Sequence, residues 1–212
     1  MRKLSHFFSW MFLPFFMPLY GLLIAMFLPF EEVQKQHIPM YALPLNIKWI
    51  VFFLFMLFCC VAPGISFIIL YRFRVLSHLE MTNRNERFFP FLIGLVYCLM
   101  LYWLLQQSDP KGLLPLYLSR LALSVLSVTI LFIVMNIFRK VSIHAGGAGI
   151  LTGFLYGFFM GVHSPSLIWM AVAFLVSGCV VSARWHLKKH SALELILGYV
   201  VAAITTGIIT AW

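Results

Sequence analysis

Residues 182–198, SARWHLKKHSALELILG, lie where one long apolar run, 166–181, gives way to another, 192–212. Such a polar turn between two apolar runs predicts a pair of membrane helices. If the second helix begins near Ser191, His190 and Glu194 share one of its faces. The carboxylate can then hold one imidazole nitrogen and leave the other free as a nucleophile or base, and Arg184 offers a planar fork suited to phosphate. The alternative is a basic loop that only fixes membrane topology.

The composition places the whole chain in a membrane. The 212 residues are 63% hydrophobic and only 10% charged, with a mean hydropathy of +0.99. A soluble domain has about a quarter charged residues, so the sequence predicts a single all-α domain over residues 1–212, a polytopic bundle of six to seven transmembrane helices. The net charge of +9 is then expected in loops that face anionic lipid, with no nucleic-acid partner. The four cysteines lie inside apolar runs and are interpreted as packing residues.

Seven apolar runs are long enough to cross a bilayer at roughly 20 residues per span. They cover residues 7–30, 47–71, 88–106, 113–138, 145–162, 166–181 and 192–212. The first run follows a basic start but lacks a small-residue cleavage site, so we expect a retained membrane helix. Pro14, Pro18 and Pro63 are expected to kink their spans, and Arg120 needs either a partner inside the bundle or a path to the surface.

The loops between these runs form two sets. The N-terminus and loops 72–87, 139–144 and 182–190 hold most of the Lys and Arg, whereas loops 31–46, 107–112 and 163–165 hold few. The positive-inside rule therefore predicts that the first set is cytoplasmic. Every polar stretch of interest then lies at a single membrane face.

Two further polar segments belong to the basic set of loops. Ser142 and His144 lead directly into a run that carries Gly149, Gly153, Gly157 and Gly161 at four-residue spacing. This spacing predicts a smooth face on which another helix packs closely. The second segment carries Arg84 and Arg87 shortly before Pro90, and it is also typical of a loop that only sets topology.

These three segments together resemble a known family. The spacing Ser182-x-Arg184-x5-His190-x3-Glu194 resembles the third signature, SRx5Hx3D, of the PAP2 superfamily of phosphatidic-acid-phosphatase-type enzymes. The pair Ser142-x-His144 resembles the second signature, PSGH. Residues Arg84 and Arg87 with Pro90 stand where the first, Kx6RP, is expected. The resemblance covers residues 84–194, about half the chain.

The sequence differs from the family pattern at several positions. No Lys stands seven residues before Arg84 or Arg87, and Val141 and Ile143 replace the Pro and Gly of the second signature. In the third signature Ala183 separates Ser from Arg. Glu194 replaces an Asp at its end.

The resemblance implies roles for individual residues. His190 would attack phosphorus and become phosphohistidine, Glu194 would orient it, and His144 would protonate the departing lipid oxygen. The remaining residues would hold the phosphoryl oxygens: Arg184, Arg87, Arg84 and Ser142. No metal or other cofactor is expected, because this face carries no carboxylate cluster for Mg²⁺.

The sequence thus favours a lipid phosphatase acting on a phosphomonoester or pyrophosphate, in a multi-pass protein of a bacterial inner membrane. Two alternatives remain open. One is a lipid phosphotransferase that uses the same site, and the other is a non-catalytic carrier or binding protein for anionic lipid. A pair of histidines with a carboxylate is unnecessary for binding alone, which favours an enzyme. The lipid and the oligomeric state stay undetermined.

Overall fold

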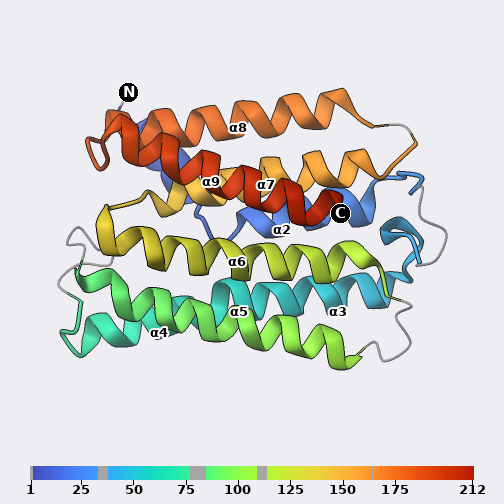
Figure 1. The fold of residues 1–212 in the computed structure, drawn as a ribbon, viewed down its shortest axis with the longest axis horizontal. Helices are drawn as coiled ribbons and strands as arrows, with labels where there is room; N and C mark the ends of the chain where they lie inside the picture. The colour runs from blue at the N-terminus through green and yellow to red at the C-terminus, as the bar shows by residue number, and fades with distance from the viewer. Residues whose placement is uncertain (1, 33–37, 77–84, 109–113, 164) are drawn as a thin grey trace.

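The computed structural model describes residues 2–32, 38–76, 85–108, 114–163 and 165–212, and this part of the chain folds into helices (Figure 1). Within the described residues, six helices are long and apolar enough to cross a membrane. They are the continuous helix Leu45–Arg72, α5 (Phe88–Ser108), α6 (Leu116–Phe138), α7 (Ile143–Met160), α8 (Leu167–His186) and α9 (Ala192–Ala211). The predicted all-α membrane bundle is confirmed.

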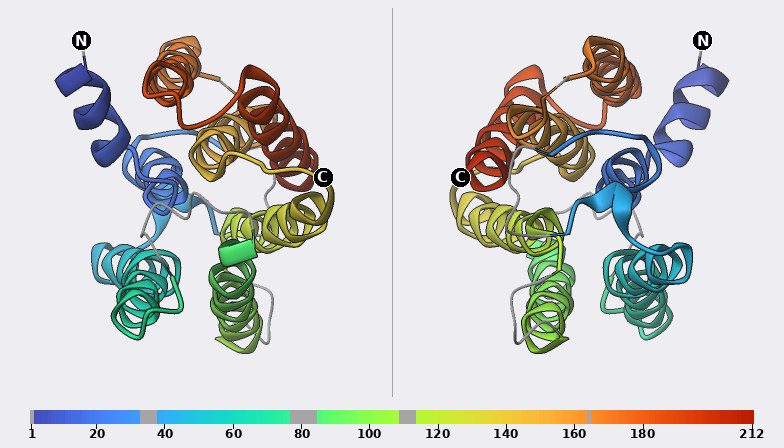
Figure 2. Two further views of the ribbon diagram at one scale, coloured as in Figure 1. Left: turned by 90° about the vertical axis from the view of Figure 1, so that its left-hand side faces the viewer. Right: turned by 90° about the vertical axis from the view of Figure 1, so that its right-hand side faces the viewer.

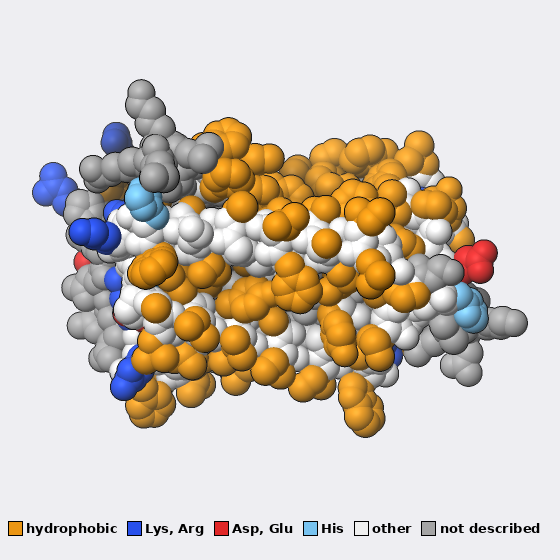
Figure 3. Space-filling model, turned by 90° about the horizontal axis from the view of Figure 1, so that it is seen from above, with side chains coloured by type: hydrophobic (Ala, Val, Ile, Leu, Met, Phe, Trp, Pro, Cys, Tyr) orange, Lys and Arg blue, Asp and Glu red, His pale blue; other side chains and the backbone are white. Residues whose placement is uncertain are grey.

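Apolar side chains cover the outside of the bundle. Large hydrophobic residues such as Ile68, Trp103 and Leu175 are exposed along the long helices. Figure 3 shows hydrophobic side chains over the middle of one face, with most of the visible Lys and Arg at one end. Apolar side chains on the outside are stable when the hydrocarbon core of a bilayer surrounds the helices. The protein is therefore a multi-pass integral membrane protein.

The first apolar run is divided, which corrects the expectation of one continuous span. Helix α1 (Arg2–Met11) ends before Pro14, and α2 (Met17–Phe27) begins after it with Pro18 in its first turn. Proline has no N–H to donate and its ring crowds the preceding turn, so two prolines four residues apart favour a break in the helix. With 11 residues, α2 is about 16 Å long, short of the ~30 Å hydrocarbon core.

The divided segment nevertheless links the two ends of the bundle. Ser9 in α1 contacts Arg184 at the end of α8. Beyond α2, the Glu31 carbonyl accepts a hydrogen bond from the His163 N–H, which lies past the far end of α7. The chain therefore crosses the bundle between residues 9 and 31, in two pieces.

The helix Leu45–Arg72 stays continuous past Pro63 by changing its winding. It consists of α3 (Leu45–Met56), a π-helical turn η2 (Leu57–Val61) and α4 (Ala62–Arg72). The wider turn lies just before Pro63, where the normal hydrogen-bond ladder cannot be kept. Cys60, in this turn, donates through its Sγ to the Phe15 carbonyl at 2.9 Å.

Helix α7 is the centre of the bundle. In an 18-residue apolar stretch of α7, 78% is buried inside the bundle, against 28% in the corresponding stretches of α8 and α9. Figure 2 shows it among α2, α6, α8 and α9, and it packs against all four. A Cβ on Gly149 or Gly153 would collide with the backbone of α9, and one on Gly157 would lie 2.6 Å from the Thr210 Cβ. The predicted close packing along this glycine face is confirmed for α9.

Gly161, the last glycine of the series, packs against α6, and Arg120 is a residue of α6. A Cβ on Gly161 would collide with the Tyr117 hydroxyl of α6 and not with α9. Arg120 donates from Nη1 to the Thr210 carbonyl of α9 at 2.9 Å, and its guanidinium lies 5.6 Å from the Tyr117 ring centre. Of the two expectations for Arg120, the partner inside the bundle is the one observed.

One end of the bundle is rich in positive charge. The carboxyl ends of α4, α6 and α8 lie at the same end as the start of α1 (Figure 1). This end, called the basic end below, carries Arg72, Arg74, Arg87, Arg139, Lys140, Arg184, Lys188 and Lys189. The polar segments that the sequence assigned to one face therefore do lie together.

Candidate functional site

Hydrogen bonds terminate α8 and cap α9 at the two ends of the turn that joins them. Lys188 has a positive φ of 53°, and the N–H groups of Lys188 and Lys189 donate to the carbonyls of Trp185 and Arg184. This hydrogen-bond pair is the Schellman termination of a helix. Ser191 then caps α9, because its Oγ accepts from the Glu194 N–H at 3.3 Å. The turn leaves His190 between the two helices, immediately before the cap.

His190 and Glu194 form the predicted pair. His190 Nδ1 lies 2.7 Å from Glu194 Oε2, and the imidazole is buried. A carboxylate accepts from Nδ1–H, so the hydrogen of the neutral ring lies on Nδ1 and the lone pair on Nε2. This is the arrangement that a nitrogen nucleophile requires.

Burial and nearby charge keep His190 neutral. Burial lowers the pKa of His190 below its usual range, the hydrogen bond to Glu194 opposes this shift, and the positive charges of Arg87 and Arg184 lower the pKa further. The net effect is a pKa below the ordinary imidazole value. The Nε2 lone pair is therefore available at neutral pH.

Arg184 is buried at the end of α8 and is held from α1. Its Nη1 donates to the Ser9 Oγ at 3.0 Å, and the His144 ring contacts the Ser9 backbone. Ser9 thus touches two of the predicted site residues. Sequence reasoning missed it, because Ser9 lies 175 positions from Arg184 in a run that reads only as a membrane anchor.

Arg87 joins the start of α5 to the loop before α7. It ends η3 (Asn85–Arg87), is buried, and donates from Nη1 to the Val141 carbonyl at 2.7 Å. Burial is the largest influence on Arg87 and lowers its pKa to about 10; Glu194 raises the pKa and Arg184 lowers it. At this value the guanidinium stays positive at neutral pH.

Ser142, next to Val141 in the same loop, caps a helix. The Ser142 Oγ accepts from the Ala145 N–H at 3.4 Å and so caps α7. Ser142 is fully buried and is not among the residues that line the cavity described below. The structure gives its hydroxyl a capping role, and the phosphate contact stays a prediction. The predicted residue Arg84 lies outside the described residues.

Lys140 belongs to the same cluster, although no role was predicted for it. Partial burial lowers the pKa of Lys140, and Arg87, Arg184 and Lys189 lower it further while Glu194 raises it. These mutual effects require the charges to lie close together. Lys140 thus places one more ammonium group beside the arginines, in a chain that lacks the Lys of the first signature.

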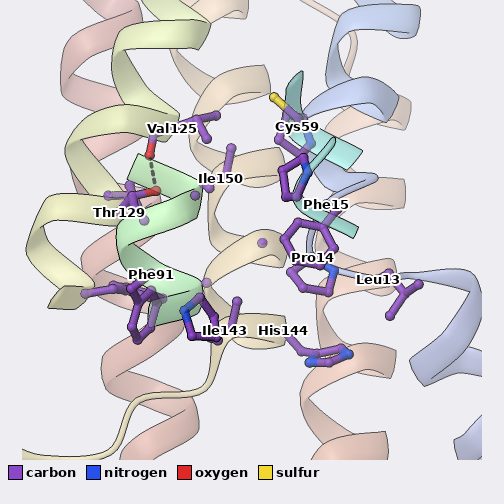
Figure 4. A pocket seen from close by; sticks show the side chains of 18 of the residues that line it. Leu13, Pro14, Phe15, Cys59, Phe91, Val125, Thr129, Ile143, His144 and Ile150 are labelled. Atoms are coloured by element: carbon purple, nitrogen blue, oxygen red, sulfur yellow. Dashed lines mark hydrogen bonds between the residues drawn. The ribbon is translucent and has the colours of Figure 1, made fainter. Parts of the chain in front are cut away.

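A cavity of about 320 Å³ begins at this cluster and continues into the bundle. Its polar lining includes Arg87, His144, Arg184 and His190, and the rest of its wall is mainly apolar. Figure 4 shows His144 near one end of the cavity and Val125 and Cys59 near the other. A head with negative charge and an apolar tail would find complementary surfaces at the two ends.

The donor groups suit an anion better than a metal ion. Within the described residues no group of three or more His, Cys, Asp or Glu could hold a metal. Two buried guanidinium groups, by contrast, match the planar geometry of phosphate oxygens. With a neutral His190 beside them, the site can bind a phosphoryl group and present a nucleophile to it.

Comparison of the chain with known protein families, with characterised proteins and with solved structures finds no match. Fold and site together define a class: a multi-pass α-helical membrane protein with a buried His–Glu pair and two arginines where an internal apolar cavity begins.

Proposed function

We propose that this protein is an integral membrane enzyme that removes phosphate from a lipid phosphomonoester or pyrophosphate through a phosphohistidine intermediate. One observation carries the proposal: Arg87, Arg184, His144 and His190 line the same cavity whose remaining wall is mainly apolar. Such a cavity suits a molecule that has a phosphate at one end and a hydrocarbon at the other. The resemblance of residues 84–194 to the PAP2 signatures supports the same chemistry.

In the first step the lone pair on His190 Nε2 attacks the terminal phosphorus. The bond between phosphorus and the leaving oxygen breaks, and His144 gives its proton to that oxygen. The lipid leaves as an alcohol from a phosphomonoester and as a lipid monophosphate from a pyrophosphate. The negative charge of the phosphate favours the protonated form of His144 that this step needs. Glu194 stabilises the positive charge that appears on the His190 ring, and Arg87 and Arg184 hold the phosphoryl oxygens.

In the second step water releases the phosphate. His144, now neutral, takes a proton from a water molecule, whose oxygen attacks phosphorus as the bond to His190 Nε2 breaks. Inorganic phosphate leaves, and both histidines return to their starting forms. The arginines supply the charge neutralisation that a metal ion provides in other phosphoryl-transfer enzymes.

The site lies at the basic end of the bundle. By the positive-inside rule we assign that end to the cytoplasmic face of a bacterial inner membrane. A phosphate site also concentrates Arg and Lys, so the assignment needs the labelling experiment described in the Discussion.

The test is phosphate release by the purified protein from a panel of lipid phosphates and pyrophosphates, in the presence of EDTA. We expect turnover by the wild type and none by His190→Ala, which should also lose acid-labile phosphate labelling. His186→Ala is the matched control, because His186 is exposed at the end of α8, four residues before His190, and the variant should keep its activity.

Other outcomes point to the other functions. Phosphate that appears on an added alcohol and not in solution indicates a phosphotransferase with the same site. Binding of anionic lipid without turnover indicates a carrier or binding protein. Labelling that survives His190→Ala would assign the nucleophile to another residue.

A further inference from the structure

The cavity reaches well into the membrane portion of the bundle. Along α5 it is lined from Pro90 through Gly94 to Cys98, next to Arg87 at the polar end. Cys98 lies eleven positions after Arg87, a distance of about 16 Å along the helix at a rise of 1.5 Å per residue. Half of the ~30 Å hydrocarbon core is about 15 Å, so the cavity extends from the basic end to about the middle of the bilayer.

The inner part of the cavity offers a hydrocarbon wall. Phe91 and Val128 lie on two of the helices that enclose it, and Val125 and Cys59 lie near its inner end (Figure 4). The Thr129 hydroxyl, which also lines it, donates to the Val125 carbonyl at 2.8 Å. Its hydrogen is therefore already used within the helix. Such a wall suits a hydrocarbon chain better than a polar one.

Gly94 keeps this part of the cavity open. It lines the cavity, and a Cβ built on it would meet no heavy atom within 4 Å. It lies seven residues after Arg87, about 10 Å along the helix. A larger side chain at this position has open space for its Cβ and would extend between the polar end and the inner end.

We infer that the cavity holds one hydrocarbon chain of the lipid inside the bundle and that Gly94 sets the length of chain accepted. The inference rests on the proposed function, because a phosphate fixed at Arg87 and Arg184 places the start of the chain at the polar end. The chain then passes Gly94 and ends near Cys98 and Val125. A specificity for chain length follows from the limited length of the cavity.

The test uses n-alkyl phosphates of eight to sixteen carbons, each at the same mole fraction in phosphatidylcholine nanodiscs. Gly94→Leu should slow phosphate release from the longest chains at least about tenfold, as expected when an overfilled cavity rejects its occupant, and should change release from the eight-carbon chain less than about twofold. Gly178→Leu is the matched control: its Cβ also meets nothing within 4 Å, but Gly178 is exposed on the outside of α8. It should keep the wild-type profile.

A second measurement separates this inference from the proposed function. Alkylphosphonates of the same lengths cannot be hydrolysed, and their binding is read as a rise in the unfolding temperature. If no phosphate is released but Gly94→Leu still shifts phosphonate binding to shorter chains, the phosphatase proposal fails and the chain site stands. If Gly94→Leu unfolds like wild type and binds or turns over every length as wild type does, the chain site is overturned. Should the Leu variant fail to fold, Gly94→Ala is measured in its place, with a smaller shift in the same direction.

Discussion

Glu194 holds His190 through its side chain and the loop before α7 through its backbone. Its Oε2 lies 2.7 Å from His190 Nδ1, and its carbonyl accepts from the Ser142 N–H at 3.3 Å. The carboxylate also lies close enough to Arg87 to raise its pKa. One residue therefore orients the imidazole, joins α9 to the start of α7 and offsets positive charge in the cluster.

Glu194→Gln separates the charge of this residue from its shape. An amide oxygen can still accept from Nδ1–H, and Ser191 still caps the helix at the 194 N–H, so we expect the fold to persist. The imidazolium formed during phosphoryl transfer loses its negative partner, and the turnover rate should fall by roughly two or more orders of magnitude. Phosphate release and the unfolding temperature of the same preparation measure the two effects.

Glu194→Asp is the control, since it keeps the charge and shortens the reach by one methylene. It should retain part of the activity. Wild-type turnover by the Gln variant would show that Glu194 serves only as a residue of the helix start.

Among the helices, α7 and α9 make the closest approach. The glycine face of α7 removes the side chains that would hold α9 away, so the two backbones come into contact. The same packing brings the start of α7, with His144, to the start of α9, with Glu194. The site geometry at the basic end thus depends on the fit of two helices along their length.

Gly153→Ala tests this packing with a single methyl group. The added Cβ would meet the Ala203 carbonyl and lie 3.0 Å from the Gly207 nitrogen, both backbone atoms of α9 that cannot rotate away. We expect a loss of about 1–3 kcal/mol in the free energy of unfolding, relative to Gly178→Ala, which makes the same change on the outside of α8. Unfolding in detergent by heat or by sodium dodecyl sulfate measures the difference. Equal stability of the two variants would mean that α7 and α9 are not in close contact.

Over the whole molecule the charges are divided between the two ends. The basic end carries most of the described Lys and Arg, while Glu31, Glu32 and His163 lie at the other. This asymmetry gives the bundle one orientation in a bilayer with a potential and anionic lipids.

Labelling of single introduced cysteines measures which side of the membrane each position faces. In a Cys179→Ser background, which removes the exposed native thiol, cysteines are placed at Arg74, Arg139 or Lys188, all exposed at the basic end. An impermeant thiol reagent should reach these three from the cytoplasmic side, and a cysteine at His163 from the opposite side. Uniform labelling of the three from outside would reverse the orientation. Mixed sidedness among them would contradict the arrangement of the site itself.

The sequence by itself determined the features that depend on near neighbours in the chain. Runs of apolar residues of membrane length specify helices, because each such helix satisfies its own backbone hydrogen bonds. The pairing of His190 with Glu194 also follows from a four-residue spacing at a helix start. The glycine spacing of α7 predicted a packing face, and the basic loops predicted which end would carry the polar cluster.

Only the tertiary structure decided which polar groups meet and what space they enclose. The contact of Ser9 with Arg184 and that of Arg87 with Val141 join segments far apart in the chain, so their formation depends on how the helices pack. Pro14 could have kinked the first span or ended it, and the surrounding bundle settled the question in favour of a break. The cavity exists because helices far apart in the chain, from α1 to α8, pack around it, and no short stretch of sequence contains that information.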